Sequence, residues 1–111
     1  LQPFGKVKVD DTVYPVLYSM GNFVSGMADH NTKETIILSL TLQRDENGKV
    51  SLKSQRYYPC YMLDFYENES FVLMPEDKRY NDGFFVKTPV SLAKEMRAHF
   101  EHIHEVVGHL Y

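Results

Sequence analysis

Short apolar runs separated by polar turns make up the first two-thirds of the chain, and they predict a succession of β-strands. Residues 4–9, Phe-Gly-Lys-Val-Lys-Val, alternate apolar and charged side chains, which is typical of a short edge strand. Residues 13–18, Val-Tyr-Pro-Val-Leu-Tyr, form an unbroken apolar run rich in β-branched and aromatic residues. Such a run predicts a central strand that is buried on both faces. The polar residues 10–12 between the two runs predict a turn.

The clearest pattern in the chain predicts a β-hairpin. Residues 36–43 place three leucines on one face and polar side chains on the other, as a half-buried strand does. Residues 45–48, Asp-Glu-Asn-Gly, contain the Asn-Gly pair that favours tight hairpin turns. Residues 49–56 alternate again, and Val50 and Leu52 are predicted to face inward.

An extended segment, residues 57–63, is predicted after the hairpin, and it contains Pro59. Proline has no N–H to donate to a β-ladder, so this segment is expected at a sheet edge or at a bulge. Residues 64–70 are predicted to form a polar loop. Residues 71–75, Phe-Val-Leu-Met-Pro, are predicted to form a short final strand.

One helix is predicted near the C-terminus. Thr88 is a favoured N-cap residue, and Pro89 is favoured at the first helical position. An apolar stripe with a spacing of three and four residues follows, and Gly108 marks the expected end. The stripe consists of Leu92, Met96, Phe100, Ile103 and Val107. The expected fold class is α+β, a mainly antiparallel β-sheet with one C-terminal helix packed on it. Residues 1–111 would form a single C-terminal domain or a fragment of a longer chain.

Composition and charge narrow the function classes. A chain of 111 residues with 43% hydrophobic residues can bury a modest core of its own. The net charge of −3 argues against a general nucleic-acid binder, which needs a basic face to replace counterions along phosphates. Because no apolar run is long enough to span a bilayer, direct membrane insertion by this segment is not expected. Cys60 is the single cysteine, so no internal disulfide can form.

The histidines and Cys60 are the first candidates for chemistry. The stretch from His104 to His109 superficially resembles a zinc-binding helix motif, but that motif needs its second histidine four positions on, not five. His99 and His102 do share a helix face, as do His102 and Glu105, and either pair could hold a metal loosely. Surface histidines of an amphipathic helix are far more often without a metal, so no metal site is predicted in this chain. Cys60, in an apolar stretch, is predicted to be an inert packing residue.

The turn after residues 13–18 is a further candidate. Ser19, Gly21 and Asn22 are small or polar, and glycine and asparagine readily adopt positive φ angles. Ligands in layered α/β proteins often collect where a buried strand ends and its loop begins. The simpler interpretation is an ordinary strand followed by a turn.

A resemblance to a known family strengthens the functional interpretation of that turn. Residues 16–24, Val-Leu-Tyr-Ser-Met-Gly-Asn-Phe-Val, resemble the "YSLGNF" signature of the CapA family of bacterial capsule and poly-γ-glutamate synthesis proteins, with Met20 in place of the usual leucine. Residues 1–3, Leu-Gln-Pro, are similar to the end of that family's "GHHPHVLQP" segment. Residues 31–38 are similar to its next strand and the approach to it.

The resemblance implies a C-terminal portion of a calcineurin-like metallophosphatase-type sandwich. It implies that a divalent metal pair is held by motifs upstream of Leu1, and that this segment lacks the metal ligands. Ser19, Gly21 and Asn22 would then line the rim of the substrate site. The parent would be a metal-dependent phosphoesterase-like hydrolase at the cell surface, tethered to the membrane through an upstream segment, and the isolated chain would not be active. Its partners would be the remainder of the parent chain and an anionic polymer or its precursor.

Two other interpretations remain open from the sequence. The chain could be an independent small β-rich module that binds a polymer or a protein partner through an aromatic surface. That surface would be built from Tyr57, Tyr58, Tyr61 and Tyr66. A third alternative is a free-standing zinc hydrolase that uses the terminal histidines.

Overall fold

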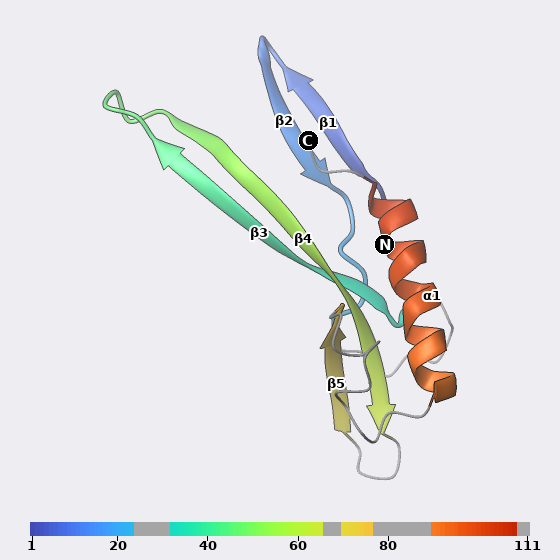
Figure 1. The fold of residues 1–111 in the computed structure, drawn as a ribbon. Helices are drawn as coiled ribbons and strands as arrows, with labels where there is room; N and C mark the ends of the chain where they lie inside the picture. The colour runs from blue at the N-terminus through green and yellow to red at the C-terminus, as the bar shows by residue number, and fades with distance from the viewer. Residues whose placement is uncertain (24–31, 66–69, 77–89, 109–111) are drawn as a thin grey trace.

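The protein consists of two antiparallel β-sheets and one helix, so the predicted α+β class is confirmed. A computed structural model describes residues 1–23, 32–65, 70–76 and 90–108. The first sheet pairs β1 (Phe4–Val9) with β2 (Thr12–Leu17), and the second has the strand order β3-β4-β5 (Figure 1). The remaining elements are β3 (Glu34–Arg44), β4 (Val50–Phe65), β5 (Ser70–Pro75) and α1 (Val90–Val107).

The β1–β2 hairpin confirms both predicted strands and the turn between them. Six residue pairs form its ladder, from Phe4 opposite Leu17 to Val9 opposite Thr12, and Asp10 in the turn has a positive φ of 52°. The prediction that the second strand is central and buried on both faces is wrong. Val13 is 55% exposed and Tyr14 is 51% exposed. The physical reason is that β2 pairs with β1 alone, and that no described element covers the outer half of this hairpin.

The β3–β4 hairpin is also confirmed, and both strands are longer than predicted. Asp45 organises its turn, because its side-chain carboxylate accepts N–H groups from Asn47 and Lys49 at 2.9 and 2.8 Å. The ladder runs from Arg44 opposite Val50 down to the start of β3, with one irregularity between Thr41 and Leu42. β4 is 16 residues long and therefore extends through the segment predicted as a separate extended stretch.

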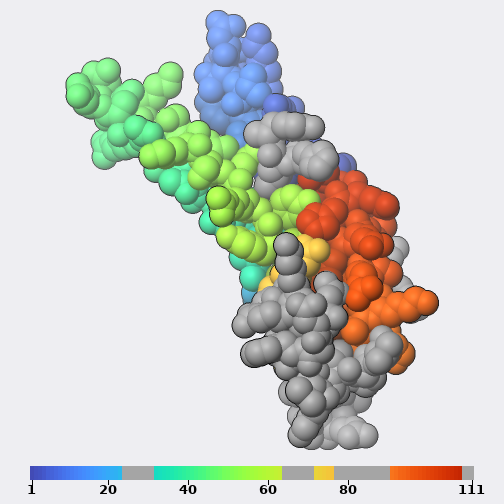
Figure 2. Space-filling model, in the orientation of Figure 1, coloured from blue at the N-terminus to red at the C-terminus, as the bar shows by residue number. Residues whose placement is uncertain are grey.

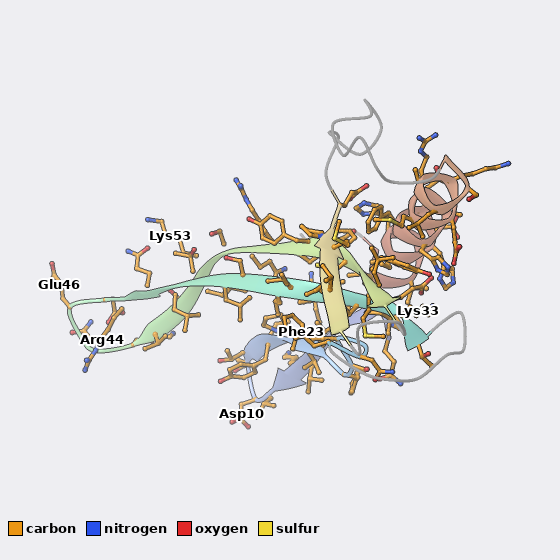
Figure 3. All side chains as sticks on the ribbon, turned by 90° about the horizontal axis from the view of Figure 1, so that it is seen from below. Asp10, Phe23, Lys33, Arg44, Glu46 and Lys53 are labelled. Carbon is orange, nitrogen blue, oxygen red and sulfur yellow. The ribbon has the colours of Figure 1, made fainter. Side chains whose placement is uncertain are left out.

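The face of this hairpin that was predicted to be buried is largely exposed in the outer half of the hairpin. Leu52 is half-buried, but Leu40, Leu42 and Val50 are 49%, 62% and 58% exposed. Figures 1 and 2 show the reason, since the tips of the two hairpins project beyond the body of the molecule. In Figure 3 the labelled tip residues Asp10 and Arg44 lie at the far side from Lys33, which lies near the helix.

Pro59 lies where β4 gains its second neighbour. β5 pairs with β4 from Cys60 to Phe65, so β4 is the middle strand there, and Pro59 comes one residue before this stretch. At Pro59 the carbonyl still accepts the N–H of Glu76 at 2.8 Å, while the missing N–H of the proline leaves no donor on the ladder. The predicted edge position is wrong for residues 60–63, where β4 lies between β3 and β5. The predicted loop at 64–70 is shorter than expected: Phe65 still belongs to β4 and Ser70 to β5, and residues 66–69 lie outside the described residues.

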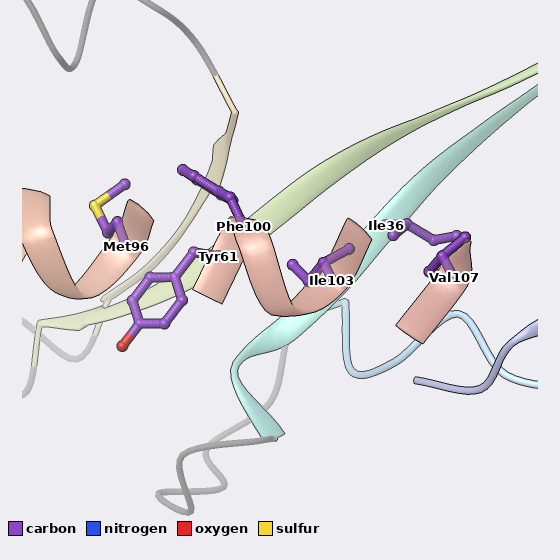
Figure 4. Close-up of a cluster of buried hydrophobic side chains, with 6 residues drawn as sticks. All are labelled: Ile36, Tyr61, Met96, Phe100, Ile103 and Val107. Carbon is purple, nitrogen blue, oxygen red and sulfur yellow. The ribbon is translucent and has the colours of Figure 1, made fainter. Parts of the chain in front are cut away.

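The core forms where α1 packs on β3 and β4. Four residues of the predicted helical stripe are buried, and Leu92 is half-buried against them, which confirms the stripe. Figure 4 shows the strand residues Ile36 and Tyr61 beside Met96, Phe100, Ile103 and Val107 of the helix. At ~1.5–3 kcal/mol for each fully buried large apolar side chain, this cluster is the main source of stability in the described part of the chain.

The helix ends as predicted at Gly108. This residue has a positive φ of 73°, and its N–H donates to the carbonyl of His104 at 3.0 Å, which closes the last turn. The predicted N-cap Thr88 and the following Pro89 lie outside the described residues. In the described part of the chain, no helix is both long enough and apolar enough to cross a membrane.

The molecule is elongated for its length. Its Cα radius of gyration is 17.0 Å and its principal extents are 53 × 27 × 25 Å. A compact domain of this length would have a radius of gyration of about 13 Å. The excess follows from the two hairpins, which extend past the region that α1 covers (Figure 1).

Candidate functional site

The Ser19–Asn22 turn is held in a fixed place by the start of β3. The carbonyl of Met20 accepts two hydrogen bonds, one from the N–H of Ile36 at 3.1 Å and one from the Thr35 hydroxyl at 2.8 Å. Gly21 forms an antiparallel bridge with Thr35. The Ser19 hydroxyl accepts the N–H of Gly21 at 3.3 Å. The turn is therefore part of the sheet edge rather than a free loop.

Gly21 cannot be replaced by a larger residue without a clash. Its φ is +83°, a left-handed conformation that side chains with a Cβ rarely adopt. A Cβ built at this position would lie 2.3 Å from the main-chain oxygen of Glu34. The turn therefore lies directly against the backbone of Glu34.

Glu34 carries a buried carboxylate that contacts two histidines of α1. Its side chain is 2% exposed. One carboxylate oxygen lies 2.6 Å from His99 Nδ1, and His102 Nδ1 lies 2.9 and 2.8 Å from the two oxygens. An ionised carboxylate only accepts hydrogen bonds, so both imidazoles donate their Nδ1–H to it. These charge-assisted bonds offset the cost of removing the carboxylate from water.

Tyr61 completes this cluster from β4. Its ring packs on the His99 ring with a centroid separation of 4.8 Å, and its hydroxyl donates to Glu95 at 2.8 Å. Burial, followed by the hydrogen bond to Glu95 and the negative charges of Glu95 and Glu34, raises the pKa of Tyr61 well above its ordinary value. Tyr61 is therefore a neutral hydrogen-bond donor near neutral pH, not a nucleophile.

A second histidine–carboxylate contact lies at the C-terminal end of α1. His104 Nε2 lies 2.7 Å from Glu76, and His104 Nδ1 lies 2.7 Å from the Tyr57 hydroxyl, which also donates to the Gly108 carbonyl at 3.2 Å. Burial, and then the charge of Glu76, raises the pKa of Tyr57. The Tyr57 hydroxyl therefore bridges the His104 ring and the last carbonyl of the helix, and both ring nitrogens of His104 have a hydrogen-bond partner.

Cys60 and the tyrosines were the other candidates from the sequence. Cys60 is fully buried, and burial raises the pKa of its thiol to about 11, so its predicted inert role agrees with the structure. The tyrosines do not form one aromatic surface, because Tyr61 is in the core and Tyr57 is half-buried against the helix. Tyr58 is 46% exposed, while Tyr66 lies outside the described residues.

The structure gives no metal cluster among the residues that it describes. Within that part of the chain, no group of three or more His, Cys, Asp or Glu side chains is placed to hold a metal ion. The described residues therefore do not by themselves fit a divalent metal pair. His109 lies outside the described residues.

A hollow of about 440 Å³ separates the β1–β2 hairpin from β4, away from the histidines. Phe4, Pro15 and Leu52 contribute apolar walls, and Lys6 and Gln55 contribute polar groups. It contains neither of the two histidine–carboxylate contacts.

Sequence reasoning found the turn and the histidine face but missed Glu34. Its partners His99 and His102 lie 65 and 68 residues further along the chain, so no local spacing could connect them. The one available signal is a glutamate at the start of an apolar strand, where a buried position is unusual for an acid.

Comparisons with protein-family models, with curated proteins and with solved structures find no match for this chain.

Proposed function

We propose that this chain is the C-terminal part of a CapA-like capsule or poly-γ-glutamate synthesis protein with a metallophosphatase-like sandwich. The observation that carries the proposal is a convergence in space. The three stretches that resemble the family are residues 1–3, 16–24 and 31–38, and their described parts meet at one point.

Hydrogen bonds define this meeting point. The N–H of Gln2 donates to the carbonyl of Ser19 at 3.3 Å, which joins the first stretch to the second. The carbonyl of Met20 accepts from both Thr35 and Ile36, which joins the second stretch to the third. Binding residues often lie on loops that a rigid scaffold positions, and the other two stretches position the Ser19–Asn22 turn in this way.

Ser19, Gly21 and Asn22 are proposed to line the rim of the parent's substrate site. Ser19 and Asn22 are half-buried, and the Gly21 backbone packs against Glu34 and Thr35, so the turn has a fixed position from which its polar groups would contact substrate. The substrate class would be an anionic polymer or its phosphate or acyl-phosphate precursor. The metal pair would be held by the preceding segments of the parent, as the family resemblance implies.

The remainder of the parent chain is proposed to cover the two hairpins. Val9 and Val13 of the first hairpin and Leu42 and Val50 of the second are all more than half exposed. Apolar strand faces of this kind are normally covered by a second layer. The parent would be tethered at the bacterial cell surface through an upstream segment.

The proposal is tested first by the coding sequence immediately upstream of Leu1. A segment similar to "GHHPHV" directly before Leu1 is expected. An upstream sequence without histidines and acids would refute the family assignment.

The role of the rim is tested in the full-length parent with Asn22→Ala. The expected result is a lower rate of polymer-precursor turnover, together with a melting temperature close to that of the unmodified protein. Asn47→Ala, in the exposed β3–β4 turn, is the matched control and should change neither quantity. A large drop in the melting temperature of Asn22→Ala would instead indicate that Asn22 only supports folding.

A further inference from the structure

We propose that His102 and Glu34 form a carboxylate–imidazole dyad in which the outward nitrogen of His102, Nε2, accepts a proton from a hydroxyl nucleophile. The nucleophile would be water or a substrate hydroxyl. His102 would be the catalytic residue and Glu34 its positioning residue. The reaction that the dyad serves rests on the proposed function, whereas the state of the dyad does not.

Glu34 determines the tautomer of His102. Glu34 is buried and anchored at the start of β3, and its carboxylate lies 2.8 and 2.9 Å from Nδ1. A carboxylate can only accept, so the proton of the neutral imidazole is on Nδ1 and its lone pair is on Nε2. A fixed tautomer of this kind is what a general base requires, since the accepting nitrogen is always ready.

His102 differs in exposure from His99, which contacts the same carboxylate. The side chain of His99 is 12% exposed, and its ring is covered by Tyr61. The side chain of His102 is 45% exposed. A nucleophile from solvent can therefore reach His102, while His99 supports Glu34 from the inside.

Proton transfer to His102 creates a positive charge beside the Glu34 carboxylate. When the O–H bond of the nucleophile breaks, the proton moves to Nε2 and the oxygen electron pair attacks the phosphorus or carbonyl carbon of the substrate. The imidazolium that forms faces the Glu34 carboxylate, which stabilises the new positive charge. His102 then returns the proton to the leaving oxygen, so the dyad is regenerated and no further reactant is needed.

Glu34 also connects the dyad to the Ser19–Asn22 turn. The main-chain oxygen of Glu34 lies against Gly21, while its side chain binds His102. One residue therefore joins the proposed rim to the proposed base. Tyr61 and Glu95 are the other titratable groups of this cluster, on β4 and on α1, and they bind each other.

A purely structural contact would make a different prediction, and His104 provides the matched control. The His104 side chain is 46% exposed, almost the same as His102. Both of its nitrogens are engaged, however, one by Tyr57 and the other by Glu76. Because the two side chains are almost equally exposed, accessibility cannot explain a difference in reactivity between the two imidazoles.

The first experiment uses the chain itself and diethyl pyrocarbonate, which acylates an unprotonated imidazole nitrogen. Mass spectrometry after short exposure near neutral pH should find His102 acylated several-fold faster than His104. Glu34→Gln should reduce the His102 rate while leaving the His104 rate unchanged. Equal rates at the two histidines would overturn the proposal.

The second experiment needs no variant, so it remains decisive if Glu34→Gln does not fold. Long-range ¹H–¹⁵N correlation spectra of the chain should show His102 with the proton on Nδ1 and the lone pair on Nε2. A His102 that carries its proton on Nε2 would exclude the dyad.

The third experiment uses the full-length parent. His102→Gln should lower kcat about 100-fold with little change in KM, and should remove the acid limb of the kcat–pH profile, whereas His104→Gln should leave both unchanged. A His102→Gln enzyme with normal kcat would refute the catalytic role. If the parent has no turnover at all, the proposed function fails, while the first two experiments still decide whether the dyad exists.

Discussion

Two clusters tie helix α1 to the sheet with the same set of chemical groups. One contains Glu34, His99 and His102 with Tyr61 and lies against Gly21. The other contains Glu76 and His104 with Tyr57 and Gly108. They differ in burial, because the side chain of Glu34 is 2% exposed and that of Glu76 is 43% exposed. We call them the inner cluster and the outer cluster.

The difference shows how burial, rather than bond length, sets the importance of an ionic contact. The shortest histidine–carboxylate distances are 2.6 Å in the inner cluster and 2.7 Å in the outer one. Water can replace the partner of Glu76, but it cannot reach the carboxylate of Glu34. Removing one member of a buried pair leaves the other without compensation, whereas an exposed pair is screened.

The largest expected effect is that of Glu34→Ala. Two imidazole donors lose their acceptor and a buried volume is left empty, so the free energy of unfolding should fall by about 3–5 kcal/mol. Urea denaturation followed by circular dichroism measures this change. Glu76→Ala is the control and should cost no more than about 1 kcal/mol. Similar losses for both variants would contradict the contrast between the clusters.

The second-largest loss of stability is expected for Gly21→Ala, with Gly108→Ala as its control. Gly21→Ala should lower the free energy of unfolding by about 2–3 kcal/mol, from the left-handed backbone and the clash with Glu34 together. Gly108→Ala has a similar positive φ but no atom within 4 Å of the new Cβ, so about 1 kcal/mol is expected. Thermal and urea unfolding of both variants provide the measurement. A Gly108→Ala loss as large as that of Gly21→Ala would show that the close contact with Glu34 is unimportant.

Tyr61→Phe tests the inner cluster at alkaline pH. Near neutral pH, the loss of the hydrogen bond to Glu95 should cost about 1 kcal/mol. The pKa of Tyr61 is raised from 10.0 in the folded state, so above pH 10 the unfolded chain loses this proton first. Stability of the unmodified protein should therefore fall as pH rises above 10, and Tyr61→Phe should fall less steeply.

Unfolding free energies between pH 9 and 11.5 measure the two slopes. Cys60 also has a raised pKa, but it is present in both proteins and its contribution cancels. Parallel curves for the two proteins would show that Tyr61 does not retain its proton on folding.

The smallest effect is expected for His104→Gln in the outer cluster. Glutamine keeps a hydrogen-bonding group but removes the ring that contacts both Glu76 and Tyr57, so the free energy of unfolding should fall by about 0.5 kcal/mol. Urea denaturation measures this change. A loss of several kcal/mol would place His104 in a much drier environment than its exposure indicates.

The sequence alone was sufficient for the elements whose pattern is local. The Asn47-Gly48 turn and the helix end at Gly108 each depend on a conformational preference of one or two residues. The helical stripe was also predictable, since it depends on periodicity within α1.

Burial of the strands was not predictable in the same way. An apolar run indicates that a strand prefers to be covered, but it does not say which segment covers it, and Val13 remains 55% exposed. The inner cluster could not be predicted from the sequence for a related reason. Glu34 and His102 meet only because α1 docks on β3, and no pattern within either element contains that information. The Ser19, Gly21 and Asn22 rim stays a prediction.

The length of β4 has a mechanical consequence. At about 3.3 Å per residue, its 16 residues span about 50 Å, close to the longest dimension of the molecule, 53 Å. A single uninterrupted strand thus acts as the spine of the protein and connects the free hairpin tip to the histidine-bearing helix. Between Thr41 and Leu42 the pairing skips Lys53, so this spine carries one extra residue there, and such a bulge bends the strand and increases its twist on the way to the tip.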